Sequence, residues 1–102
     1  MRQDIDSGLA GTIEEIEELL RHPDTDDALH VARQSRELIA ECLAGLDLAD
    51  GIDGLSRGER KARGLMSRSS GILATHAHGD WDSFDVHARQ PVLADIARFL
   101  GR

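Results

Sequence analysis

Residues that favour β-sheet are scarce in this sequence. Its 102 residues include no Tyr, one Trp and two Phe, and three Val and three Thr stand against thirteen Leu and twelve Ala. Straight-chain and small side chains lose little rotamer freedom in a helix, whereas β-branched and aromatic side chains suit strands. The composition therefore predicts an all-α protein and excludes an all-β one. A chain of this length forms one core, so residues 1–102 are expected to be a single domain.

The chain has one cysteine, Cys42, and no long apolar run. A single cysteine cannot form an intramolecular disulfide, and the N-terminal residues do not form a charged and then apolar leader. The longest apolar runs are a few residues, against the roughly 20 that span a bilayer. We therefore expect a cytoplasmic protein with no membrane partner.

Basic residues are fewer than acidic ones, and they are distributed unevenly along the chain. Residues 1–53 contain 14 acids and 4 bases, a net of −10, and residues 54–102 contain 5 acids and 8 bases, a net of +3, which gives −7 for the chain. This balance argues against nucleic acid as a partner, because phosphate binding depends on cationic density. The basic run from Arg57 to Arg68 lacks interleaved aromatic residues, and we predict that it pairs with the acidic first helix.

Apolar spacing predicts a first helix over residues 7–21. Steps of four, three and four place these residues on one face: Leu9, Ile13, Ile16 and Leu20. The glutamates between them are assigned to the solvent side: Glu14, Glu15, Glu17 and Glu18. Asp6 or Ser7 is the expected N-cap, and Pro23 follows the end of the helix.

A second helix is predicted from the acidic segment 24–27, which supplies its cap, to about Gly45. Its buried seam repeats at alternating steps of four and three: Ala28, Ala32, Ser35, Ile39, Cys42 and Leu46. Further apolar residues widen this stripe, so it needs neighbours on both sides, and a second subunit is one way to supply them. Residues 46–55, with three acids and two glycines, are predicted to be the longest linker, partly anchored by Leu48, Ile52 and Leu55.

Ser56 and Glu59 fit a capping box, which predicts a third helix that ends at Gly79. Its buried positions at helical spacing are Ala62, Leu65, Met66, Ser69, Ile72, Leu73 and His76. Gly64 and Gly71 lie on another face, and each costs about 1 kcal/mol relative to Ala in a helix interior. We therefore expect another backbone to approach the helix closely there.

The last segment predicts a short helix from about Ser83, a break or kink before Pro91, and a terminal helix to Leu100 capped by Gln90. Together these patterns predict a small four-helix, mostly antiparallel bundle whose last helix is split near Pro91.

Metal-ligating side chains are concentrated between Thr75 and His87. His76, His78 and Asp80 follow one another at steps of two, with Asp82 and His87 nearby. The stretch resembles the Thr-His-x-His-x-Asp-His signature of the metallo-β-lactamase superfamily, which implies one or two zinc ions held at these positions. The resemblance covers about a tenth of the chain. Trp81 stands where the last His of the signature belongs, and 102 residues are too few for the αββα sandwich of that family.

A divalent-metal site without that fold is an alternative for His76, His78 and Asp80, completed by Asp82 or His87. Against it, Gly79 is expected to end the third helix and to turn Asp80 away from the two histidines. Imidazoles in a last helical turn are also favoured by the negative end of the helix dipole, without any metal.

Three further kinds of chemistry lack a residue or an environment that they need. Phosphotransfer needs an exposed histidine with a small or basic neighbour one turn on, and His30 has Arg33 but no glycine after it. Residues 51–56 are similar to the Asp-Ser-Leu attachment site of acyl carrier proteins, but Gly54 replaces the serine that carries the prosthetic group. Cys42 lies on the apolar seam and is interpreted as a core residue, not a nucleophile.

These patterns favour a non-enzymatic function. We predict a small helical bundle that acts as a protein-interaction or regulatory module, associates as a homodimer and needs no cofactor. The alternatives are a small protein that binds zinc or another divalent ion through His76, His78 and Asp80, and an acidic inhibitor or antitoxin-like protein that mimics a polyanion. Elemental analysis and the mass in solution separate the first two classes.

Overall fold

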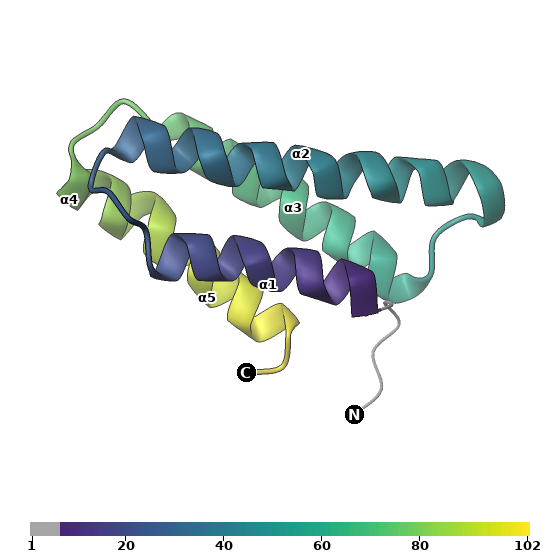
Figure 1. The fold of residues 1–102 in the computed structure, drawn as a ribbon. Coiled ribbons are helices and arrows are strands. Elements are labelled where there is room, and N and C mark those ends of the chain that lie inside the picture. The colour runs from purple at the N-terminus through teal and green to yellow at the C-terminus, as the bar shows by residue number, and fades with distance from the viewer. Residues whose placement is uncertain (1–6) are drawn as a thin grey trace.

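A computed structural model describes residues 7–102 (Figure 1). The elements are α1 (Ser7–Arg21), α2 (Ala28–Asp53), α3 (Arg57–Thr75), α4 (Trp81–Phe84), a π-helical turn η1 (Asp85–Arg89) and α5 (Gln90–Phe99). Because α4, η1 and α5 follow one another without a gap, they form one helical rod, and the bundle has four helices. Successive helices run antiparallel (Figure 1). The predicted all-α, mostly antiparallel bundle is confirmed.

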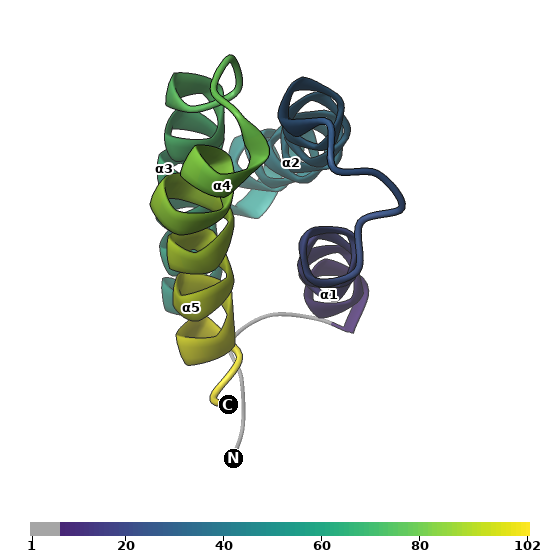
Figure 2. The same ribbon diagram turned by 90° about the vertical axis from the view of Figure 1, so that its left-hand side faces the viewer.

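Figure 2 shows α1 below α2 and α5 in front of α3, so that α1 lies diagonally across the bundle from α3, and α2 from α5. Each of α1 and α3 packs against both α2 and α5. The core between them contains the largest fully buried side chains of the described residues: Ile13, Ile16, Leu20, Ile39, Met66, Leu73, Phe84 and Ile96. The predicted seam of α2 is buried along its whole length, Ser35 and Cys42 included.

Two predicted helix starts are confirmed by their caps. At α2, the Asp27 carboxylate accepts hydrogen bonds from the N–H groups of Leu29 (3.1 Å) and His30 (3.4 Å). At α3, the Glu59 N–H donates to Ser56 Oγ (3.1 Å), and the Ser56 N–H donates to Glu59 Oε1 (2.9 Å). These bonds satisfy N–H groups that have no partner within the helix. For α1, the predicted start at Ser7 is right, and Asp6 lies outside the described residues.

The predicted linker over residues 46–55 is wrong, because α2 continues to Asp53. Arg63 of α3 forms ion pairs with Asp47 and with Asp50 (3.6 Å), which hold the added turns against α3. The helix ends at Gly54, whose φ of +77° is a left-handed conformation that glycine adopts without strain. Leu48 and Ile52 do not anchor the segment, since both side chains are exposed, whereas Leu55 is partly buried against the core as predicted.

The third helix is shorter than predicted, and its glycines do not contact another backbone. It ends at Thr75, and His76 is its C-cap. Gly64 and Gly71 are exposed, and a Cβ atom at either position would meet nothing within 4 Å. The expected close approach at these glycines is therefore wrong within this chain.

The last helix begins two residues earlier than predicted and is not broken at Pro91. Asp80 caps it, with its carboxylate accepting from the Ser83 N–H (2.8 Å). Proline has no N–H and its ring collides with the carbonyl four residues earlier, so one wider turn accommodates it. In that turn the Gln90 N–H donates to the carbonyl of Asp85, five residues back. Gln90 is consequently an interior residue and not a cap.

The prediction that the basic side chains of α3 pair with α1 is wrong, because the two helices are diagonal in the bundle (Figure 2). Arg63 pairs with α2, and Arg68 lies 3.8 Å from Asp95 of α5. Within residues 7–102, no helix combines the length and the apolar character that a membrane crossing requires.

Candidate functional site

The predicted metal ligands are directed to different places by the turn between α3 and α4. His76 closes α3, and its ring stacks on that of His87 in η1, with centroids 5.4 Å apart and planes at 23°. Asp80 is engaged as the cap of α4. His78 is exposed and lines a shallow hollow between α2 and α3 beside Leu29 and Arg33.

The structure thus brings His76 together with His87, and it does not join His76, His78 and Asp80 into one cluster. Among residues 7–102, no group of three or more His, Cys, Asp or Glu side chains is placed to hold a metal ion. Asp82 is exposed in the first turn of α4.

Cys42 lies where the sequence predicts. Cys42 is a buried free thiol on the seam of α2, and burial raises the pKa of that thiol above its ordinary value. A protonated, buried thiol is a poor nucleophile, so its interpretation as a core residue holds. His30 is exposed, next to the buried seam residue Val31.

The most unusual surface feature is an apolar pair at the end of α2. Leu48 is 71% exposed and Ile52 is 78% exposed, the two highest values among the exposed large hydrophobic residues of the range 7–102. They are four residues apart, so they share one face of the helix. The last turns of α2 project beyond the first turns of α1 and α3 (Figure 1). We call this pair, Leu48 and Ile52, the α2 knob.

A groove runs between α3 and α5 on another side of the bundle. Its volume is about 490 Å³, and it is lined by Lys61, Gly64, Leu65, Arg68, Asp95, Arg98 and Phe99. Leu65 is almost fully buried and Phe99 is partly buried, so the groove has an apolar floor. Gly64 adds no side chain to its wall, which leaves the groove open. We call it the α3/α5 groove.

The rim of the α3/α5 groove has a net positive charge. Asp95 is its one carboxylate, and it pairs with Arg98 (3.1 Å) and, at 3.8 Å, with Arg68. Lys61 forms no ion pair within the described part of the chain. Three cations against one anion leave the rim attractive to negative charge.

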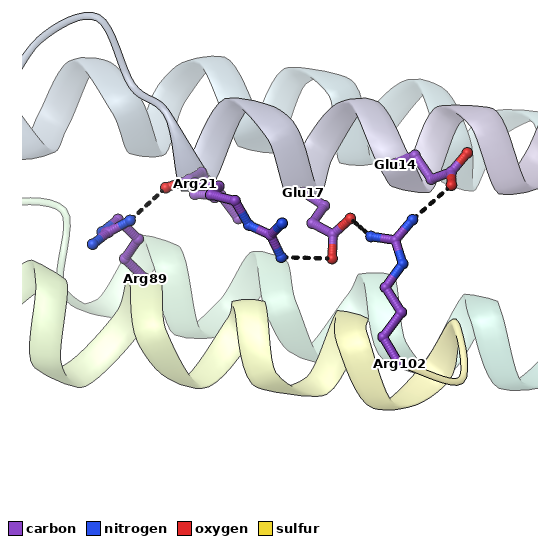
Figure 3. A network of polar contacts seen from close by, with 6 residues as sticks. Glu14, Glu17, Arg21, Arg89 and Arg102 are labelled. Atoms are coloured by element: carbon purple, nitrogen blue, oxygen red, sulfur yellow. Dashed lines mark hydrogen bonds and ion pairs between the residues drawn. The ribbon is translucent and has the colours of Figure 1, made fainter.

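A second polar cluster joins α1 to the end of the chain (Figure 3). Glu17 is 4% exposed, which contradicts its predicted position on the solvent side. Its carboxylate accepts from Arg102 and from Arg21 (3.3 Å), and Arg102 also donates to Glu14 (2.8 Å). A buried carboxylate needs such partners, so this cluster has a structural explanation.

Sequence reasoning missed both the α2 knob and the α3/α5 groove. The knob was hidden because residues 46–55 were predicted to be a linker, although the four-residue step from Leu48 to Ile52 fits a helix. The groove required knowing that α3 packs on α5. The repeat of Lys61, Gly64 and Arg68 along one helix face was its only signal in the sequence.

Comparison with protein-family models, with curated proteins and with solved structures finds no significant match for this chain.

Proposed function

We propose that this protein is a non-enzymatic interaction module that associates with a second copy of itself. The observation that carries the proposal is the α2 knob, in which two large apolar side chains stand exposed on a projecting helix end. The homodimer predicted from the sequence is the smallest assembly that self-association can form.

Burial of the knob supplies a driving force for association. Covering a fully exposed Leu or Ile side chain contributes about 1.5–3 kcal/mol. Two such residues do not alone offset the several kcal/mol lost when two molecules lose their independent motion, so polar and charged contacts around the knob must contribute as well. Exposed apolar residues grouped on one surface commonly mark interaction sites.

Several titratable side chains have structural roles, which supports a non-enzymatic function. Asp27, Glu59 and Asp80 cap helices, and Glu17 binds two arginines. Cys42 is buried as a thiol. In each of these five cases the geometry is explained by folding, without a role in catalysis.

Sedimentation velocity over low micromolar to millimolar concentrations tests the proposal. We expect the average mass to rise above 11.2 kDa with concentration. The double variant Leu48→Ser/Ile52→Ser should remain monomeric, because it removes the knob. Val86→Ser is the matched control, since Val86 is also exposed (56%) but lies on η1. A parent protein that sediments as a single 11.2 kDa species throughout would refute self-association.

A further inference from the structure

We propose that the α2 knob of one copy docks in the α3/α5 groove of a second copy, so that the protein assembles head to tail. This inference rests on the proposed self-association and names the surface that receives the knob. Two arguments support it, one from apolar complementarity and one from charge.

The shapes and apolar surfaces of the two sites are complementary. The knob is a helix end that presents Leu48 and Ile52 outward. The groove has an apolar floor of Leu65 and Phe99, and Gly64 leaves open space along one wall. A helix that places side chains four residues apart into a groove is a common way for proteins to bind one another.

The charges of the two sites are opposite. Asp53 directly follows Ile52, and Glu41 lies two turns before Leu48 on the same face; both are exposed. The C-terminal end of α2 adds the negative end of its helix dipole. The groove offers Lys61, Arg68 and Arg98 against the single carboxylate of Asp95. Docking the knob there brings opposite charges together.

Charge also disfavours the simplest competing arrangement, in which two knobs meet symmetrically. Such a contact places Asp53, Glu41 and the negative helix end of one copy beside the same groups of the other. Like charges in close contact oppose association and favour another register. The groove is the surface described above on which the knob gains attraction in place of repulsion.

The two sites lie on different parts of the molecule, which determines how the assembly grows. The groove involves α5, and α5 is diagonally opposite α2 in the bundle (Figure 2). A head-to-tail dimer therefore retains one free knob and one free groove. Unless the assembly closes into a ring, its mass continues to rise with concentration. An assembly built on a symmetric knob-to-knob contact, by contrast, does not grow beyond the dimer.

Two variants and their mixture test the inference by sedimentation velocity. The knob variant Leu48→Ser/Ile52→Ser retains an intact groove, and the groove variant Lys61→Glu/Arg98→Glu retains an intact knob. We expect each alone to be monomeric. An equal mixture should form a one-to-one dimer that grows no further, because only one functional knob and one functional groove meet. The control variant Arg33→Glu/Arg36→Glu changes the net charge by the same amount as the groove variant, but on the surface of α2. It should assemble as the parent protein does.

A steric variant provides an independent test without changing charge. Gly64→Gln places a side chain in the groove, while Gln suits an exposed helix position better than Gly. We expect a higher melting temperature together with weaker association. These opposite directions separate a blocked groove from a damaged fold. Association should also weaken as salt is added, since the charges on the rim are exposed.

Each outcome bears on one claim. If the parent assembles but the groove variant and Gly64→Gln assemble equally well, the groove is not the receiving surface and head-to-tail docking is wrong, while self-association stands. If the groove variant forms a dimer that stops growing, the contact is knob to knob. If the parent is monomeric at every concentration, the proposed function fails together with this inference.

Discussion

Single residues were predictable from the sequence where their position is set by helical periodicity. Ile39, Ser35 and Cys42 were assigned to the core from their spacing alone, and all three are buried in α2. Periodicity works there because the seam faces a neighbour along its full length. Glu17 was missed for the opposite reason. Its main partner, Arg102, is 85 residues away, and no local pattern announces such a pair.

Ile39 offers a direct test of the buried face. Its side chain has no exposed surface, so Ile39→Ala should lower the free energy of unfolding by about 2–5 kcal/mol through lost burial and a residual cavity. Ile52→Ala makes the same change at an exposed position and should alter stability by less than about 0.5 kcal/mol. Urea denaturation at low protein concentration measures both. Equal midpoints for the two variants would show that the buried face is misassigned.

At the scale of elements, helix starts were more predictable than helix ends. Caps such as Asp27 and Ser56 are local and chemically specific. The end of α2 was placed too early because Gly45, Gly51 and three aspartates disfavour helix. Tertiary contacts outweigh this preference, since Leu46 is buried and Arg63 pairs with two of those aspartates.

The candidate site shows the same division between local and tertiary information. The sequence grouped His76, His78 and Asp80 because they are close along the chain. The structure separates them, because α3 ends at Thr75 and Asp80 begins the next helix as its cap. The α3/α5 groove, by contrast, combines residues from two helices, such as Lys61 and Arg98, which no sequence pattern connects.

Glycines within α3 and at the end of α2 should respond in opposite directions to substitution. Gly71→Ala should stabilise the protein by about 0.5–1 kcal/mol, because the position is exposed, helical and free of neighbours within 4 Å. Gly54→Ala should destabilise it by about 1–2 kcal/mol, since its φ of +77° is strained for alanine. Thermal or urea unfolding of both variants measures these changes in stability. A loss of stability in Gly71→Ala would indicate a close contact at that face.

At the scale of the whole molecule, the bundle is closed by contacts between its first and last helices. Arg102 donates to Glu14 and Glu17 of α1, and Arg89 of η1 donates to the carbonyl of Leu20 (2.8 Å) (Figure 3). The turns between successive helices are short, but no turn joins α1 to α5. Contacts made by side chains hold that side of the bundle together, so they determine how firmly the last helix is held against the first.

Removal of Arg102 tests this closure. Arg102→Ala leaves the buried Glu17 carboxylate with Arg21 as its remaining ion-pair partner, and we expect a loss of about 1–2 kcal/mol, moderated because the Arg102 side chain is 45% exposed. Arg98→Ala, at a side chain 76% exposed, is the control and should change stability by less than about 0.5 kcal/mol. Adding Glu17→Gln to Arg102→Ala should recover part of the loss, because the charge that lacks its partner is gone. If Arg102→Ala unfolds at the same urea concentration as Arg98→Ala, the arginine does not hold α1 and α5 together, and the core packing between these helices is sufficient to close the bundle.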